Sequence, residues 1–572
     1  MMKTIEISYN GLIDEAARFV EKIQLLDKPL WEKVTAVFAY GKYKEGWHGE
    51  YWGKLMRGGC IVYKYTKSKE LYSALTKTVR DLLDCQDDEG RISTYNKEYE
   101  LYDWDVWCRK YVMYGLMYYY DICKDEVFKK EILTALISHA DYIVERLGRE
   151  DAGKREIVTT STFWLGVNSA SILRPYVLLY KLTGNKKYLE FAEYIISTGG
   201  IQGGNLIDLA IEDKLAPYQY PEVKAYETIS FFEGVFEYAT MIKNVRLISA
   251  CLKFSQKILE TDITLIGAVG CYDELFDNCT KKQVSCSPDD RMQETCVTVT
   301  LMEYMCRMLE YTGDSKYADA IEISFYNAFL GAINRNYGKN EGLHFDSYSP
   351  ILNGKRGISV GGKQTLLDGS YYGCCAAIGA AGFGAVTSMS AQVEEDTLKV
   401  SFYENGKIKF GSNEVCVKTD YPFDGKIELS VDSASDEFGL ALRIPAWCEN
   451  YTLTVNGERV TGILDKGYLV LDKKISANDR IIFDLDMPFR AYDSVDYDEA
   501  VDTFFAVAKG PIVFAATDFS GHIFTKDFSS YSFDGRESTL IVTTASGEEV
   551  TLRNYAACGI DWNQKMTVWL EK

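Results

Sequence analysis

The sequence predicts an α+β multidomain protein: an (α/α)6 helical barrel followed by C-terminal antiparallel β-sandwich modules. Three observations support this. The chain has 572 residues, too many for one hydrophobic core. Apolar residues recur at helical spacing up to about residue 390. Short alternating runs then follow. We expect the barrel in 1–390, a β-sandwich in 391–516, and in 517–572 a second small β unit or closing strands of the sandwich.

Helical periodicity recurs throughout the first 390 residues. With an N-terminal helix and one after Gly373, the total is about twelve helices. The periodic segments are 51–66, 70–86, 105–123, 127–147, 169–184, 186–198, 225–242, 246–259, 294–313 and 315–333.

A short link recurs between paired helices. In Gly184-Asn185 and Gly313-Asp314 the glycine ends one helix and the Asn or Asp caps the next. Residues 65–69 are a weaker copy. About six such hairpins would close an (α/α)6 barrel with a central substrate cavity, although an open solenoid satisfies the same periodicity.

The C-terminal part alternates between apolar and polar residues in short runs separated by Gly, Asn and Asp, which is typical of antiparallel strands. Asn456-Gly457 is a hairpin signal. The runs are 396–404, 425–433, 440–447, 451–460, 467–472 and 479–487.

Composition limits the partners. The net charge of -20 argues against a nucleic acid or an anionic membrane as partner and favours a neutral small molecule or sugar. The first residues lack the pattern of a signal peptide, and no run reaches the ~18 apolar residues of a membrane span. We therefore expect a cytoplasmic protein whose 15 cysteines are reduced. The sequence is compatible with a homodimer.

Two cysteine motifs could hold a metal. Glu294-Thr295-Cys296 opens one helix, and Cys374-Cys375 enters another from a Gly-rich turn. One carboxylate and three thiols suit tetrahedral Zn²⁺. On spacing alone, buried thiols without a metal are the more common case, since free cysteine is among the most buried residue types. Cys271, Cys279 and Cys286 match no zinc module, and we interpret them as structural.

These motifs, together with 267–270 leading to Asp273-Glu274, resemble the β-L-arabinofuranosidase family, glycoside hydrolase family 127, and its sister family 146. Further blocks stand in the family's order, at 49–59, 307–332, 442–447, 454–458 and 507–514. The resemblance implies a retaining glycosidase that binds Zn²⁺ through Glu294, Cys296, Cys374 and Cys375. It also implies Cys374 as the nucleophile and Glu274 as the general acid/base.

The sequence departs from the family at two places. Ala376-Ala377-Ile378 follows the paired cysteines where founding members have two prolines and an asparagine. A His-Glu pair typical of the family is replaced by residues 104–108. We expect the zinc centre to be retained and the sugar pocket to differ, which leaves the sugar open. The candidate substrate-binding residues are His48, Glu50, Tyr51, Trp52, Tyr226, Glu227 and His344.

Two alternative hypotheses account for the same residues. The barrel could use two carboxylates, Glu274 with Glu50 or Glu227, as a hydrolase or lyase, which would make Cys374 dispensable. Alternatively, it could be a catalytically silent carbohydrate-binding protein.

Overall fold

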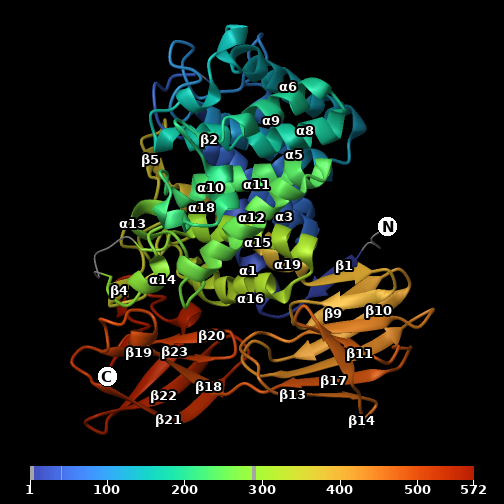
Figure 1. Cartoon of the computed structure of the whole chain (residues 1–572), viewed down its shortest axis with the longest axis vertical. Helices are drawn as coiled ribbons and strands as arrows, with labels where there is room; N and C mark the ends of the chain where they lie inside the picture. Colours follow the sequence, from blue (N-terminus) through green and yellow to red (C-terminus); the bar gives the residue numbers. More distant parts are fainter. Residues whose placement is uncertain (1–4, 40, 287–291) are drawn as a thin grey trace.

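The computed structural model describes residues 5–39, 41–286 and 292–572. A helical N-terminal domain lies above two β units that stand side by side (Figure 1). This confirms the predicted fold class. Among the described residues, none of the helices combines the length and apolar character that crossing a membrane requires.

The helical domain consists of two rings. The inner helices are buried on almost every side, as expected of helices enclosed by a second layer. Each packs against the next, from α3 to α5, α8, α11, α15 and back through α18 and α19. They are α3 (Glu50–Thr66), α5 (Asp105–Ile122), α7 (Val167–Ala170) with α8 (Leu173–Thr183), α11 (Ala225–Ile242), α15 (Thr295–Thr312), and α18 (Cys374–Gly379) with α19 (Phe383–Met389).

The outer helices bury only one stripe. In α4, for example, Leu71, Leu75 and Leu82 face the inner ring. The outer helices are α1 (Leu12–Val20), α2 (Lys28–Ala36), α4 (Lys69–Leu83), α6 (Glu126–Arg146), α9 (Lys186–Ser197), α10 (Leu206–Glu212), α12 (Val245–Thr261) and α16 (Ser315–Ile323).

The recurring link has the predicted local structure. Gly184 and Gly313 end α8 and α15 at φ 68° and 66°. The side chains of Asn185 and Asp314 then accept backbone hydrogen bonds at the start of α9 and α16.

The first β unit is a sandwich of two sheets. The larger sheet runs β1 (Ile5–Tyr9), β9 (Gly406–Phe410), β10 (Asn413–Thr419), β11 (Lys426–Ser433), β17 (Arg480–Leu485), β13 (Tyr451–Val455), β14 (Glu458–Arg459). The smaller runs β15 (Gly462–Asp465), β16 (Tyr468–Leu471), β12 (Gly439–Arg443), β8 (Thr397–Val400), β7 (Ala391–Glu394). The pairing is antiparallel except between β12 and β8. The predicted hairpin at Asn456-Gly457 joins β13 to β14, with both residues at positive φ.

The last β unit is one sheet that begins at Phe489. Its order is β18 (Phe489–Asp493), β19 (Phe504–Lys509), β20 (Ile512–Ala515), β23 (Glu549–Asn554), β22 (Ser538–Thr544), β21 (Phe524–Phe533), with β25 (Leu570–Glu571) beside β19. The strands of 489–515 therefore pair with those after 517, across the boundary expected at 516/517. Strand β1 likewise pairs within the sandwich although it lies in 1–390.

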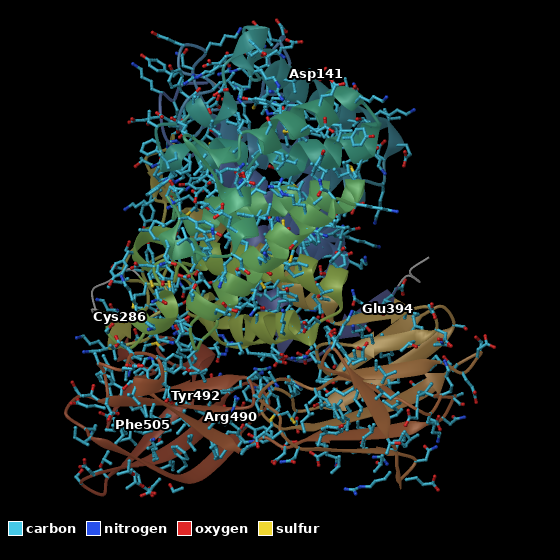
Figure 2. The ribbon with its side chains drawn as sticks, viewed as in Figure 1. Asp141, Cys286, Glu394, Arg490, Tyr492 and Phe505 are labelled. Atoms are coloured by element: carbon cyan, nitrogen blue, oxygen red, sulfur yellow. The ribbon has the colours of Figure 1, made fainter. Side chains whose placement is uncertain are left out.

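Both β units are attached to the barrel through buried contacts. Arg443 on β12 bonds to Asp319 on α16 at 2.6 Å and pairs with Glu322 of the same helix. Figure 2 shows Cys286 on the barrel side, above Tyr492 and Phe505 of the last sheet. Cys286 shares a second apolar core with Ala506 and Trp569.

Candidate active site

The candidate site lies where the N-terminal ends of the inner helices converge. Contacts between Glu50 and Trp107, and between Lys54 and Tyr111, show that α3 and α5 run parallel. Tyr226 at the start of α11 contacts Tyr111 as well. Because backbone N–H groups point outward at a helix N-terminus, this end of the barrel favours anionic groups.

Four predicted metal ligands meet at this end. Glu294, Cys296, Cys374 and Cys375 are buried, and their ligand atoms all lie within 4.8 Å of one another. Sγ of Cys375 is 3.0 Å from Oε1 of Glu294, and Sγ of Cys374 is 3.5 Å from the same oxygen. The two cysteine Sγ atoms are 3.8 Å apart. The structure thus assembles into one cluster residues that are far apart in the sequence.

Two glycines allow the cluster to close. A Cβ on Gly362, which has φ +55°, would lie 2.4 Å from Sγ of Cys374. A Cβ on Gly361 would lie 2.8 Å from Oε1 of Glu294 and 3.1 Å from Sγ of Cys375. Only residues without a side chain fit against the three ligands at these positions.

The donor set fits a divalent cation. Burial, Glu274 and Cys374 raise the pKa of Glu294 well above its usual range. Burial raises the pKa of the Cys296 thiol, but hydrogen bonds to Cys374 and Cys375 and the Lys54 ammonium lower it overall. Four groups so close repel each other when ionised, and a cation removes that repulsion. Three soft thiolates and one carboxylate match the preferences of Zn²⁺.

Glu274 lies beside this cluster at the end of α13 (Cys271–Glu274). Its Oε1 is 4.0 Å from Sγ of Cys374, and its Oε2 is 2.6 Å from Nζ of Lys224. Burial raises the pKa of Glu274, but Lys224 and a hydrogen bond with Glu294 bring it below its usual value. These opposite shifts place the proton of the Glu274–Glu294 pair on Glu294.

Glu50 and Tyr226 belong to a polar group in the centre of the barrel. Lys54 bonds to Glu50 at 2.9 Å, and its Nζ lies 4.6 Å from the centre of the Tyr226 ring. Trp107 also donates to Glu50. Lys54 is one of the groups that lower the pKa of Cys296, so this polar group adjoins the cluster of Glu294 and the three cysteines.

Glu227 is buried near the same end of the barrel. Burial raises its pKa to about 8, with Lys224 opposing the shift and Glu274 adding to it. The charges of Lys224 and Glu274 therefore both act on the pKa of Glu227.

His48 and Tyr51 hold the loop that covers the cluster. Tyr51 donates to the carbonyl of Gly362 at 2.6 Å, and Nε2 of His48 lies 3.1 Å from the carbonyl of Thr365. Burial lowers the pKa of His48 to about 4. Both side chains are thus engaged with backbone groups of the loop.

Unlike the other predicted substrate-binding residues, Trp52 and His344 have their described contacts outside the cluster. Trp52 is fully buried and donates to Thr78 of α4 at 3.0 Å, so it faces the outer ring. His344 stacks on Tyr337 at 4.2 Å and lies 6.4 Å from the ring of Tyr372. Among the described residues, no contact joins either side chain to the cluster, because each packs against other residues.

Some residues of the site were not anticipated from the sequence. Lys54, Lys224 and Trp47 all contact it, the last by donating to the carbonyl of Gly362 at 2.8 Å. A usable signal exists for Lys54, since it stands four residues after Glu50 inside an otherwise apolar inner helix. The Gly361-Gly362 pair is a second signal, because adjacent glycines indicate a loop that packs closely against other groups.

A second group of potential ligands lies on the sandwich. Glu414, Cys416 and Asp432 lie within 4.8 Å of one another. Lys407 and Lys409 already pair with Glu414, so the charge there is balanced without a metal.

The chain is similar to known proteins over most of its length. The model of the β-L-arabinofuranosidase GH127 catalytic domain matches residues 12–340, more than half of the chain. The GH127 middle-domain model matches 397–487. A non-reducing end β-L-arabinofuranosidase from Bifidobacterium longum subsp. longum is 25% identical over 389 residues, which are 59% of this chain and 55% of that protein. The matched part thus spans about half the length of that relative.

Two solved structures have the same fold. A GH127 β-L-arabinofuranosidase from Geobacillus stearothermophilus T6 superposes with a TM-score of 0.77 at 20% identity, covering 99% of this chain and 100% of that one. A GH127 β-arabinofuranosidase superposes at 0.74 with 18% identity, covering 100% and 98%. On the evidence of the two domain models, the chain belongs to the β-L-arabinofuranosidase family, glycoside hydrolase family 127.

Proposed function

We propose that this protein is a retaining glycoside hydrolase of the β-L-arabinofuranosidase type, with Cys374 as nucleophile and Glu274 as general acid/base. One observation carries the proposal: a buried cysteine lies in a Glu/Cys3 cluster with a carboxylate oxygen 4.0 Å from its sulfur. Retaining glycosidases place nucleophile and acid about 5 Å apart, and this spacing is similar.

Glu294, Cys296, Cys374 and Cys375 would hold Zn²⁺. When bound, the ion would keep the thiols ionised at neutral pH and so supply a nucleophilic thiolate. The Gly361-Gly362 loop would keep the cluster closed, since it leaves no room for another side chain.

The reaction would proceed in two displacements on this chain's own residues. Cys374 attacks the anomeric carbon and forms a C–S bond while the bond to the leaving oxygen breaks. Glu274 gives its proton to that oxygen. It then takes a proton from water, which attacks the anomeric carbon and releases the sulfur with net retention. The acid role requires the proton of the Glu274–Glu294 pair to be on Glu274, and a cation held by Glu294 would keep Glu294 ionised and so leave that proton to Glu274.

Lys224 would orient Glu274. Its ammonium contacts the carboxylate oxygen that does not face Cys374, which directs the other oxygen toward the reacting atoms. The two-carboxylate alternative is less well supported, since both Glu50 oxygens are already engaged by Lys54 and Trp107.

The substrate in this proposal is a glycoside or oligosaccharide with a terminal furanose. Location in the cytoplasm and a homodimer remain predictions from the sequence. The assigned roles of His48, Tyr51, Tyr226, Glu227 and His344 in holding sugar also remain predictions, and Trp52 has the least support because it faces the outer ring.

A panel of nitrophenyl glycosides, including β-L-arabinofuranoside, tests the proposal. Cys374→Ala should abolish turnover while the fold is kept, and Cys416→Ala on the sandwich is the matched control. Full activity of Cys374→Ala would overturn the assignment of the nucleophile.

A further inference from the structure

The segment 161–166 presents apolar side chains to solvent at the site. Phe163 is 43% exposed and Leu165 38%, whereas their neighbours Ser161 and Gly166 are buried. Trp164, between them, is half-buried. Exposed apolar groups gathered in this way mark binding surfaces more often than isolated ones do.

The backbone of this segment is held in an unusual conformation. Trp164 and Leu165 both have positive φ, 53° and 49°, which costs energy for residues with side chains. Hydrogen bonds fix it: Gln202 donates to the carbonyl of Leu165 at 2.8 Å, and Gly166 donates to that of Phe163 at 3.0 Å. Strain that the surrounding structure maintains is typical of functional segments.

On one side, Phe163 is linked to the nucleophile by a row of rings. Its ring stacks on Trp104 at 5.7 Å, and Trp104 meets Trp47 edge to face at 5.4 Å. Trp47 donates to the carbonyl of Gly362, the glycine that lies against Cys374.

On the other side, Trp164 is linked to the general acid. Nζ of Lys224 lies 4.7 Å from the centre of the Trp164 ring and 2.6 Å from Oε2 of Glu274. Phe163 and Trp164 together therefore connect both catalytic residues along one rim.

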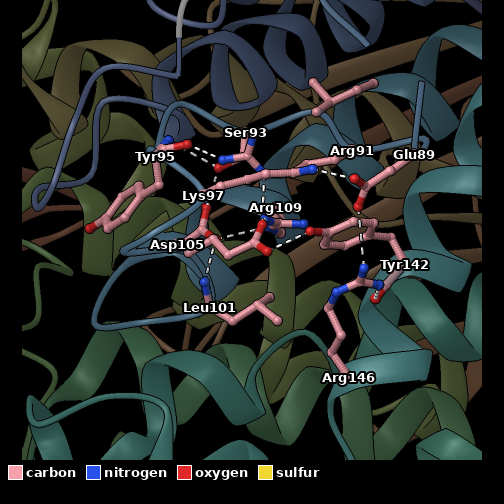
Figure 3. Close-up of polar contacts among 12 residues, drawn as sticks. Glu89, Arg91, Ser93, Tyr95, Lys97, Leu101, Asp105, Arg109, Tyr142 and Arg146 are labelled. Atoms are coloured by element: carbon pink, nitrogen blue, oxygen red, sulfur yellow. Dashed lines mark hydrogen bonds and ion pairs between the residues drawn. The ribbon is translucent and has the colours of Figure 1, made fainter. Parts of the chain in front are cut away.

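The rim rests on a fixed base. Asp105, which follows Trp104, accepts hydrogen bonds from Ser93 at 2.5 Å, from the backbone of Leu101 at 2.7 Å, and from Arg109 at 3.0 Å (Figure 3). Asp105 is fully buried, so this network fixes the loop before α5 and with it the backbone next to Trp104. A preformed surface loses little entropy when a ligand binds.

We propose that Phe163 and Trp164 form the subsite for the sugar on the leaving-group side of the scissile bond. This rests on the proposed function. The leaving oxygen takes its proton from Glu274, so the leaving group must lie on the side of Glu274, where Lys224 and Trp164 are. The ring of Phe163, which is 43% exposed beside the half-buried Trp164, suits the C–H face of a sugar, so the preferred substrate class is an oligosaccharide whose second sugar reaches this ring.

The test compares β-L-arabinofuranobiose with methyl β-L-arabinofuranoside, whose methyl group is too small to reach the rim. For Phe163→Ala we expect the ratio of kcat/KM for the disaccharide to that for the methyl glycoside to fall about tenfold, which corresponds to the loss of about 1.4 kcal/mol of binding to the ring. Trp164→Ala should lower the same ratio, and Trp164→Phe should restore it. Tyr311→Ala, which removes a 51% exposed ring at the C-terminal end of α15, is the control and should leave the ratio unchanged.

The outcomes separate the two proposals. An unchanged ratio in Phe163→Ala, or equal losses on both substrates, would overturn the subsite and leave the proposed function standing. Inactivity of the unmodified protein on both glycosides would overturn the proposed function and the subsite with it. Melting temperature and zinc content, measured for each variant, identify any loss that comes from misfolding.

Discussion

Sγ of Cys374 lies 4.0 Å from Oε1 of Glu274, although the two residues are 100 positions apart in the chain. The contact exists because α13 and the N-terminus of α18 reach the same end of the barrel. It places the proposed nucleophile beside a carboxyl group that can carry a proton.

Replacing the proposed acid should separate substrates by their leaving groups. Glu274→Gln cannot donate a proton, so we expect turnover of glycosides with poor leaving groups to fall about 10²–10⁴-fold. Activated aryl glycosides, whose leaving groups need no proton, should keep part of their first-step rate. Steady-state kinetics on both classes provide the measurement, with Glu341→Gln at an exposed position as control. Equal losses on both classes would show that Glu274 is not the acid.

Filling the space beside Cys374 should disrupt the cluster. In Gly362→Ala the new Cβ would lie 2.4 Å from Sγ of Cys374, so we expect zinc to fall from about one per chain to less than half and activity to be lost. Gly369→Ala, in the turn that follows the short strand Gln364–Thr365, is the matched control, because Gly369 too has positive φ but no atom within 4 Å of the new Cβ. Metal analysis of both variants, purified without chelator, measures the zinc content per chain. Normal zinc content in Gly362→Ala would contradict the packing described.

Removing the buried ion pairs between the barrel and the sandwich should destabilise the protein. Arg443 is fully buried between Asp319 and Glu322, and Arg443→Ala would leave two carboxylates without their cation. We expect a loss of about 3–5 kcal/mol in the free energy of unfolding. Arg480→Ala removes an exposed pair with Glu428 and should cost at most about 1 kcal/mol. Denaturant unfolding measures both, and similar small losses would show that the buried pair is not needed.

A buried carboxyl should make stability depend on pH. Glu404 accepts hydrogen bonds from the backbone of Leu12 and Ile13, and burial raises its pKa to about 7 despite these bonds. Between about pH 4.5 and 7 the folded protein keeps this proton while the unfolded chain has released it, so stability falls as pH rises through that window. Glu404→Gln removes this contribution. The melting temperature of the variant relative to the unmodified protein should therefore be higher at pH 8 than at pH 5. A pH-independent difference would contradict the raised pKa.

The helical hairpins could be predicted from local chemistry. Gly184 and Gly313 end helices, and Asn185 and Asp314 cap the next ones, because these signals depend only on neighbouring residues. Strand β1 could not be placed in this way. Its partner β9 lies about four hundred residues later, and pairing over such a distance leaves no local pattern.

The site was only partly predictable for the same reason. The resemblance to the family brought together Glu294, Cys296, Cys374 and Cys375, which the structure gathers within 4.8 Å. It did not reveal Lys224, whose role depends on a contact with Glu274 fifty residues away.

Trapping the covalent intermediate tests the central claim most directly. Glu274→Gln, treated with 4-nitrophenyl β-L-arabinofuranoside, should form the C–S bond but hydrolyse it slowly because the base is missing. Peptide mass spectrometry should then find one pentosyl group on Cys374. A pentosyl group on Glu50 or Glu227, or turnover without any adduct on Cys374, would contradict this account.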